Sequence, residues 1–430
     1  MLEVLSVIFW GLVLLSIIIF IHEMGHYLAA RAFGLRVKEF MIGLPGPKLS
    51  IKRKDTRFGV TAIPLGGYCL IAGMERGLEG PEVEKALTYI SGVGVASEDQ
   101  ADCAGEPYGI DLIRGLDILA DWGTVRRYKA RGIYHYALSS ATLNGINYKE
   151  GQARLIGDLS TFIASERKLI YSAKPWWKRV VILLAGSAAN LLAAMAILIA
   201  LIMVNGTQVY TTTIDEVLEN SPAAEAGLTA GDQLVSINHE ILDSWADFVE
   251  ELQKHEVGDT VLLGYLHNER EQVVEITLAN NEGRPMIGVV PLVTREPVSF
   301  LQAAEHSTVL IGMTLSAIMQ LLNPATFADT IGQTSSVVGI SIEASAAAAA
   351  GPFPFILLVA ALSISIGFMN LLPIPPLDGG KIIIETIERV TMRRIPTSII
   401  NGVSVAGFAA LILLLIAATN ADIQRYFIGG

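Results

Sequence analysis

Two histidines four residues apart carry the clearest chemistry in this sequence. The run His22-Glu23-Met24-Gly25-His26 has the form His-Glu-x-x-His. Residues four apart lie on nearly the same face of a helix, so the two imidazoles can hold one Zn²⁺ ion. Glu23 would then lie close enough to take a proton from a water that the metal activates. The run predicts a hydrolytic zinc site, with His22 and His26 as ligands and Glu23 as the base.

The setting of this run favours a functional site over a chance pairing of polar residues. It lies near the end of an apolar stretch from Val4 to Ala30 that is long enough to cross a bilayer. Ionisable residues inside such a span are costly and usually functional. The stretch lacks a basic start and a small-residue cleavage site, so we interpret it as a retained span and not as a signal peptide.

A third ligand is needed, because catalytic zinc usually has three protein ligands and one open position. Asp378 follows a second apolar stretch and a segment rich in proline, at a depth similar to that of the two histidines. Successive prolines free backbone groups, which a membrane protein tolerates inside protein or a wet cavity. Taken by itself, this segment fits an ordinary helix stop equally well, with Asp378 as a turn residue.

The elements that must position these residues are membrane helices. The 430 residues are 52% hydrophobic and 17% charged, with a mean hydropathy of +0.49, whereas a soluble domain has about 25% charged residues. The formal net charge of -11 argues against nucleic acid as a partner. The predicted spans are Val4–Ala30, Val180–Val204, Pro354–Leu372 and Ile399–Ala418.

Basic residues give the expected orientation. They are concentrated between spans one and two and between spans three and four, and basic loops face the cytosol. Both termini and the segment 205–350 are therefore expected outside the cytosol, with the active site toward the cytosolic side.

The remaining segments of the chain differ in residue composition. Residues 207–292 resemble a small soluble domain, with β-rich runs at Tyr210–Val217, Gln233–Ile237, Thr260–Leu266 and Gln272–Leu278. Residues 80–172 contain helical patches such as Ile110–Ala120 but no recognised motif. They are interpreted as a cytosolic insertion of unknown fold. Residues 299–322 are apolar with few charges and could form an interfacial helix or a fifth span, and Glu305 and His306 favour the interface.

Together these features resemble the site-2 protease family of intramembrane zinc metalloproteases, in particular the RseP/RasP-like group with a PDZ domain. The resemblance rests on four segments: His22–His26, the loop from Ile63 to Tyr68, the run from Lys174 to Arg179, and Asn370 through Gly380. It implies that His22, His26 and Asp378 bind Zn²⁺ and that Glu23 is the catalytic base.

The resemblance also implies residues that contact substrate. Asn370 matches the asparagine before the Leu-Asp-Gly motif, and Gly66 and Gly67 lie in the matching loop. The run Gly186-Ser187-Ala188-Ala189-Asn190 resembles a Gly-Pro-x-x-Asn motif, which would make Asn190 a further substrate-binding residue. Packing of small residues between helices explains this run equally well.

The same resemblance implies particular folds for two segments. Residues 36–70 match a membrane-associated β-hairpin region whose edge could pair with an unwound substrate strand. Residues 221–238 match a PDZ domain, with a closing strand at 283–291. Two departures stand out: Lys381 replaces the histidine usual after Leu-Asp-Gly-Gly, and Ser187 replaces the proline of the second motif.

The predicted fold class is a multi-pass α-helical membrane protein with about four transmembrane helices, a membrane-associated β-hairpin region and an extracytoplasmic PDZ domain. The expected parts are span one at 1–35, the β region at 36–79, the insertion at 80–172, span two at 173–206, the PDZ domain at 207–292, an interfacial helix and linker at 293–350, span three at 351–385, and span four with the C-terminus at 386–430.

The predicted function is hydrolysis of peptide bonds in or near the transmembrane segments of other proteins, at a bacterial plasma membrane. The family resemblance alone implies the substrates, which would be single-span proteins such as anti-sigma factors or signal-peptide remnants. A peptide or substrate ectodomain is the expected PDZ ligand. A catalytically silent, PDZ-bearing membrane scaffold is the alternative. A transporter with an intramembrane His and Asp relay is a weaker one, since no internal repeat is visible.

Overall fold

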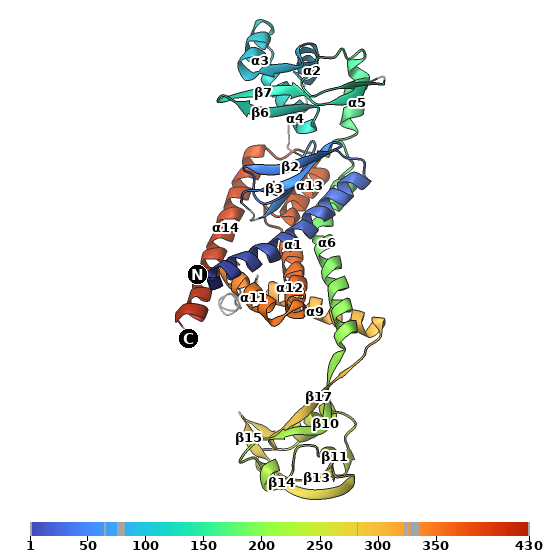
Figure 1. The fold of residues 1–430 in the computed structure, drawn as a ribbon, viewed down its shortest axis with the longest axis vertical. Helices are drawn as coiled ribbons and strands as arrows, with labels where there is room; N and C mark the ends of the chain where they lie inside the picture. The colour runs from blue at the N-terminus through green and yellow to red at the C-terminus, as the bar shows by residue number, and fades with distance from the viewer. Residues whose placement is uncertain are drawn as a thin grey trace. The chain divides into compact units, whose positions relative to one another are not determined.

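The computed structural model describes residues 2–63, 66–74, 82–143, 145–281, 283–321, 323, 325–326 and 335–428. The chain forms two compact units (Figure 1). One, the helical unit, comprises Met1–Ile197 and Ser307–Gly430; the other, the β-rich unit, comprises Leu198–His306.

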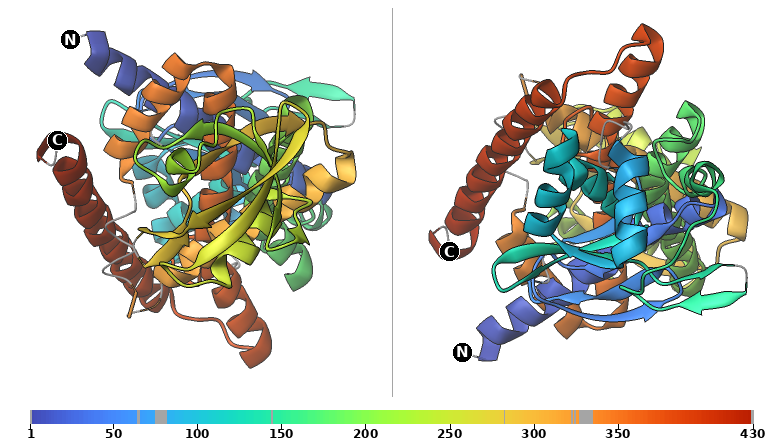
Figure 2. Two further views of the ribbon diagram at one scale, coloured as in Figure 1. Left: turned by 90° about the horizontal axis from the view of Figure 1, so that it is seen from below. Right: turned by 90° about the horizontal axis from the view of Figure 1, so that it is seen from above.

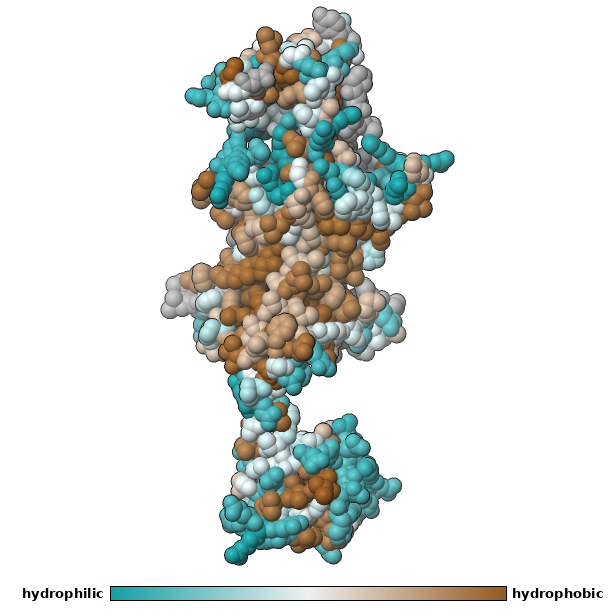
Figure 3. Space-filling model, turned by 90° about the vertical axis from the view of Figure 1, so that its right-hand side faces the viewer, coloured by the Kyte–Doolittle hydropathy of each residue, from teal (hydrophilic) through white to brown (hydrophobic). Residues whose placement is uncertain are grey.

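In the described part of the chain, four helices are long and apolar enough to cross a membrane. They fall at the four predicted stretches: α1 (Leu2–Ala32), α6 (Trp176–Asn205), α12 (Pro352–Asn370) and α14 (Thr397–Ile423). Figure 3 shows hydrophobic residues covering the part of the helical unit that the helices form. An apolar surface of this kind suits lipid as its solvent.

Two further helices lie in the region predicted as an interfacial helix and linker. α9 (Phe300–Leu321) coincides with the apolar run at 299–322. α11 (Val337–Ala350) was not predicted, and it packs against α1 and α12 around a core that includes Leu14 and Ala344. A Cβ on Gly11 would lie 2.7 Å from the Cβ of Ser341. The prediction of a plain linker is therefore wrong: its small residues allow a close helix–helix contact.

The predicted β-hairpin is part of a larger sheet. β1 (Val37–Ile42), β2 (Lys48–Arg53), β3 (Thr56–Thr61) and β4 (Gly67–Ile71) form a four-stranded sheet in the order β2-β3-β1-β4. β2 and β3 are the hairpin, β1 lies parallel to β3, and β4 pairs antiparallel with β1 at the edge. The prediction of a hairpin was incomplete. It missed the pairing of β1 with β3 and β4, which depends on tertiary contacts and not on the local sequence pattern.

The insertion is a folded module with its own hydrophobic core. Its elements are α2 (Glu82–Val93), β5 (Val95–Ser97), α3 (Glu98–Gly105), η1 (Glu106–Tyr108), α4 (Leu112–Trp122), β6 (Val125–Ala130), β7 (Ile133–Leu138), β8 (Ala141–Leu143), β9 (Ile146–Tyr148) and α5 (Leu159–Arg167). α4 confirms the helical patch predicted near 110–120. The strand order β5-β7-β6, with α3 and α4 between β5 and β6, is the order of a winged helix.

The segments that enclose this module are joined to each other. The Tyr171 amide donates to the Ala72 carbonyl at 2.8 Å, and the Ala72 amide donates to the Arg36 carbonyl at 2.9 Å. Ion pairs add to this connection: Arg36 holds Glu166 of α5, and Lys38 holds Asp121 of α4. The insertion is therefore anchored to the start of β1.

The C-terminal part of the helical unit consists of α13 (Asp378–Thr391) and α14, followed by the π-helical turn η2 (Gln424–Ile428). α14 stands at the edge of the unit in the views of Figures 1 and 2. Near its end, Asp422 accepts hydrogen bonds from the amides of Ser336 and Gly339 at the start of α11.

The β-rich unit is built on a six-stranded sheet, β14-β13-β11-β10-β17, with β12 paired to β11. Ile214, Leu234 and Leu263 are in its core. Its elements are β10 (Thr207–Val217), α7 (Pro222–Glu225), β11 (Gln233–Ile237), β12 (Glu240–Ile241), α8 (Trp245–Gln253), β13 (Thr260–His267), β14 (Arg270–Thr277), β15 (Ala279–Asn281), β16 (Arg284–Met286) and β17 (Val289–Glu296).

The four predicted β-rich runs are confirmed as β10, β11, β13 and β14. The predicted closing strand at 283–291 is corrected. Gly288 has a φ of +82°, which interrupts an extended strand. β16 therefore pairs with β15, and β17 begins at Val289 and pairs with β10.

Candidate metal centre

The two histidines of α1 meet a carboxylate from α13. His22 and His26 lie one helical turn apart, and their Nε2 atoms are 3.2 Å from each other. Asp378 Oδ2 lies 3.2 Å from His22 Nε2 and 3.0 Å from His26 Nε2. All three residues are buried. The structure thus brings together residues that are more than 350 positions apart in the sequence.

Two of the three candidate ligands, His26 and Asp378, are oriented toward the cluster by hydrogen bonds on their far sides. His26 Nδ1 lies 2.8 Å from the carbonyl oxygen of Ile182 in α6 and donates to it, which leaves the lone pair of Nε2 for the cluster. Lys381 Nζ donates to Asp378 Oδ1 at 3.0 Å, leaving Oδ2 for the cluster. The positively charged lysine stands where the family resemblance leads us to expect histidine.

The surroundings of Asp378 favour its ionised form. The ammonium group of Lys381 lies 3.0 Å from Asp378 Oδ1 and stabilises the negative charge. Asp378 is also the first residue of α13, where the helix dipole stabilises a negative charge.

This set of atoms fits zinc. Nitrogen and oxygen ligands about 2.0–2.1 Å from a tetrahedral Zn²⁺ lie about 3.3 Å from one another, and the three separations here are 3.0–3.2 Å. Two imidazoles and one carboxylate are a known ligand set of catalytic zinc sites with an open fourth position. Three acceptor atoms this close together, two of them on imidazoles, also suit a shared cation better than one another.

A cavity of about 360 Å³ opens beside the cluster. Of the other predicted site residues, Glu23, Gly66, Gly67 and Asn370 line it, together with residues that the sequence analysis did not assign. These unassigned residues are Ile19, Tyr68, Cys69, Ile71, Met74, Ile366, Pro376 and Leu377. The strand β4 and the helices α1 and α12 therefore share one cavity with the candidate metal ligands.

Asn190 is placed differently. It is fully buried in α6, and in the described part of the chain its amide group has no hydrogen-bond partner. It does not line the cavity. From the same run, Gly186 packs directly on the histidines: a Cβ there would lie 2.7 Å from His22 Cε1 and closer still to His26 Nε2. The structure brings the start of this run to the candidate metal centre and leaves Asn190 apart from the cavity.

Some parts of the centre left little or no sequence signal. The carbonyl of Ile182 is a backbone group, so no residue type could indicate it. Tyr68 lay within the loop used for the family resemblance, but its contact was not foreseen: its hydroxyl donates to Glu39 Oε2 of β1 at 3.0 Å. Pro64 and Leu65 of the same loop lie outside the described residues.

Known proteins are similar to this chain over nearly its whole length. The pattern of Peptidase family M50 matches residues 10–414. The regulator of sigma-W protease RasP of Bacillus subtilis (strain 168) is 27% identical over 436 residues, covering 97% of this chain and 98% of that protein. The zinc metalloprotease RasP of Geobacillus kaustophilus (strain HTA426) is 27% identical over 445 residues, covering both chains completely.

Solved structures also match, each over a short part of the chain. The PDZ domain of the SdrC-like protein from Listeria monocytogenes is 30% identical and covers 20% of this chain and 88% of that one, with a TM-score of 0.17. The family match, in contrast, extends from α1 to α14 and includes every residue of the candidate centre. This chain belongs to peptidase family M50.

Proposed function

We propose that this chain cuts peptide bonds in or near the transmembrane segments of other membrane proteins, with His22, His26 and Asp378 as zinc ligands and Glu23 as the base. As a member of peptidase family M50 it is a site-2 type zinc metalloprotease. The observation that carries the residue roles is the convergence of His22, His26 and Asp378 beside Glu23, in a cavity among apolar helices.

The residues of the centre have separable tasks in this reaction. A zinc ion held by the three ligands would supply Lewis-acid activation of water and of the peptide carbonyl. Glu23 accepts a proton from the attacking water and returns it to the amine nitrogen as the peptide bond breaks. Lys381 keeps Asp378 ionised and fixes its second oxygen, and Ile182 holds the ring of His26.

The strand β4 is suited to hold the substrate. It is an edge strand of its sheet, and Gly67, Tyr68 and Cys69 on it line the cavity next to Glu23. An unwound substrate segment that pairs with such an edge would present its carbonyl, which a helix shields. Asn370 lies across the same cavity and carries an amide that can both donate and accept hydrogen bonds with a peptide backbone.

The proposed setting is a bacterial plasma membrane, with four spans and the centre toward the cytosol. The basic flanks of the loops between spans one and two and between spans three and four support this orientation. We assign the β-rich unit to the outer side as a PDZ domain that filters substrate ectodomains. The proposed class of substrate is a single-span protein, in keeping with a relative named as a regulator of sigma-W.

The deciding experiment compares purified wild type with Glu23→Gln in detergent, each with zinc and a panel of single-span substrates. We expect cleavage by wild type in the cytosolic half of the substrate span. Glu23→Gln should hold zinc in the same amount and cut at a rate lower by at least about 10²–10⁴-fold, the usual contribution of a general base. Mass spectrometry of the products locates the cut, and elemental analysis counts the metal.

The outcome also separates the catalytic proposal from a silent scaffold. A wild-type protein that binds no zinc under these conditions would make the scaffold the better description. Equal cleavage by both proteins would remove Glu23 as the base while leaving the metal centre intact.

A further inference from the structure

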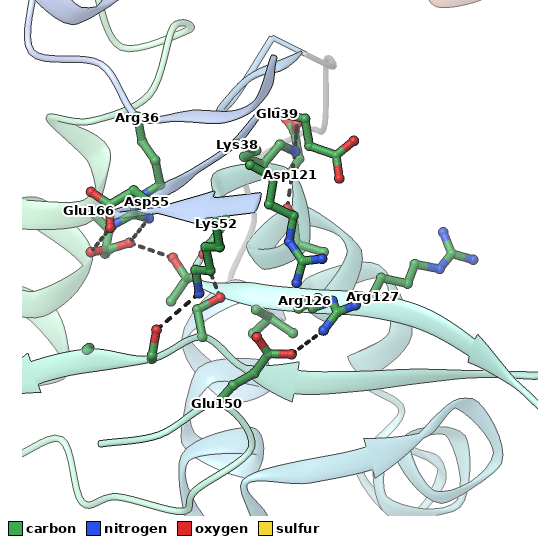
Figure 4. A pocket seen from close by; sticks show the side chains of 18 of the residues that line it. Arg36, Lys38, Glu39, Lys52, Asp55, Asp121, Arg126, Arg127, Glu150 and Glu166 are labelled. Carbon is green, nitrogen blue, oxygen red and sulfur yellow. Dashed lines mark hydrogen bonds and ion pairs between the residues drawn. The ribbon is translucent and has the colours of Figure 1, made fainter. Parts of the chain in front are cut away.

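A second, larger cleft lies between the four-stranded sheet and the insertion, apart from the metal centre. Its volume is about 780 Å³, within the usual range for small-molecule sites. Figure 4 shows charged side chains from both modules pointing into it. Its basic lining residues are Arg36, Lys38, Lys48, Lys52, Arg57, Arg126, Arg127 and Arg154, and its acidic ones are Glu39, Asp55, Asp117, Asp121, Glu150 and Glu166.

Most of these charges are already paired. Lys48 holds Glu39, Lys38 holds Asp121, Arg36 holds Glu166, Arg126 holds Glu150 and Arg127 holds Asp117, at separations of 2.5–3.2 Å. The eight basic and six acidic residues leave the lining with an excess of two positive charges.

Arg154 is the deepest of the basic residues without a carboxylate partner. It is 5% exposed, and one of its terminal nitrogens donates to the carbonyl of Ser139 at 2.8 Å. Its Nε finds no hydrogen-bond partner within the described residues. The nearby Glu166 is taken up by two bonds from Arg36 and one from Thr124. Within the described residues, the hydrogen bonds of this carboxylate therefore go to Arg36 and Thr124, and not to Arg154.

Arg154 is thus a buried cation with one backbone hydrogen bond, the Tyr148 ring at 5.8 Å and an Nε that has no partner among the described residues. An anion that reaches this nitrogen would offset the cost of burying the charge. Guanidinium groups bind planar oxyanions with a fork of donors, and phosphate is one of their preferred ligands. A phosphate monoester carries about −1.5 to −2 charge at neutral pH, which matches the excess of the lining. Lys52 and Arg57 stand in the same cleft to meet a second oxygen.

We propose that this cleft binds a phosphate group, carried either by a soluble phosphorylated molecule or by the headgroup of an anionic lipid. The site is joined to the metal centre by direct contacts. Glu39 lines the cleft and accepts the hydroxyl of Tyr68, which lines the catalytic cavity. Leu70 of β4 lines the cleft, two residues from Tyr68. A bound phosphate would hold the insertion against the strands that frame the metal centre.

The test measures binding to the full chain and needs no proteolysis. In neutral detergent, equilibrium dialysis with radiolabelled inorganic phosphate and with ATP reports a soluble ligand. In nanodiscs of phosphatidylcholine with or without phosphatidic acid, whose headgroup is a phosphate monoester, the melting temperature reports a lipid headgroup. Each measurement uses wild type, Arg154→Gln, the surface double variant Lys52→Gln/Arg57→Gln, and Arg114→Gln. Arg114 is an exposed arginine of α4 outside the cleft, and serves as the matched control.

We expect saturable binding in one of the two arms, which also identifies the source of the phosphate. Arg154→Gln should weaken it by at least about tenfold, the equivalent of one charge-assisted hydrogen bond, and Arg114→Gln should leave it unchanged. If Arg154→Gln does not fold, the double variant must show the loss. The proposal is overturned if no probe binds wild type, or if the cleft variants bind as the control does.

Discussion

At the scale of single residues, the two carboxylate oxygens of Asp378 have different partners. Its Oδ2 faces both histidines, while its Oδ1 accepts from Lys381. A lysine cannot ligate a metal while protonated, so the family position that usually carries histidine is here filled by a cation that orients the ligand. The departure noted in the sequence therefore lies next to the metal ligands and leaves their number at three.

Removing each side chain should separate these tasks. Asp378→Ala should lower zinc affinity by about 100-fold or more, because the cluster loses an anionic ligand. Lys381→Gln should lower it by about tenfold, the usual effect of removing a hydrogen-bond partner of a ligand. Competition with a chromophoric chelator measures both. Unchanged affinity in Asp378→Ala would remove this residue from the ligand set.

Gly186 offers an independent residue-scale test that leaves every ligand in place. A methyl group there would meet both imidazole rings from α6. We expect Gly186→Ala to reduce both zinc content and activity, since the helices are held close by the Gly25 contact with Ala185 and cannot easily separate. Gly402→Ala in α14 is the control, because a Cβ added there would have no neighbouring atom within 4 Å. Full zinc content in Gly186→Ala would show that α6 yields at this point.

The sequence could predict one half of the centre more firmly than the other. His22, Glu23 and His26 follow from local helix geometry, which depends on spacing alone. Asp378 came from matching depth and from a family resemblance, since no local rule joins positions in α1 and α13. Asn190 came from a motif resemblance as well, and its side chain lies buried away from the cavity.

At the scale of elements, the end of α14 is tied to the beginning of α11. Asp422 is fully buried and accepts from the Ser336 amide at 2.6 Å and from the Gly339 amide at 3.2 Å. These amides belong to the start of α11, where backbone donors have no partner within the helix. The Ser336 side chain caps the Val338 amide locally, and the carboxylate from α14 accepts from two further amides at this helix start.

Asp422→Ala should therefore loosen α11 and α14 together. Loss of hydrogen bonds to a charged acceptor costs about 1.5–3 kcal/mol, which should lower the melting temperature in detergent by several degrees. Asn420→Ala, at an exposed position of α14, is the matched control. A melting temperature equal to that of the control would mean that the contact contributes little to stability.

Elements with strong local signals were predicted and those that depend on partners were not. The four spans and the strands β10, β11, β13 and β14 follow from hydropathy and alternation. α11 is rich in alanine and too short to span a membrane, so its sequence could equally be a linker. The parallel pairing of β1 with β3 could not be predicted, because it depends on which strand, here β4, pairs with the other edge of β1.

At the scale of the molecule, the β-rich unit is a separable body. It has its own core, and its first and last strands pair, with Thr207 opposite Glu296. Replacing 207–292 with a short Gly-Ser linker should therefore preserve the metal centre. We expect altered substrate choice and cleavage of a truncated substrate at a rate within a few-fold of wild type. Loss of activity on every substrate, with zinc retained, would assign the unit a role in catalysis.

The ends of the insertion lie close together, and this affects how the protein can evolve. Because Ala72 and Tyr171 are hydrogen-bonded through their backbones, the insertion begins and ends at one place beside the four-stranded sheet. A segment with adjacent ends can be gained, lost or exchanged by recombination without moving the strands on either side. Residues 82–167 could therefore be replaced by a compact reporter domain with close termini. Such a reporter would be attached beside the four-stranded sheet, whose strand β4 lines the cavity of the candidate metal centre.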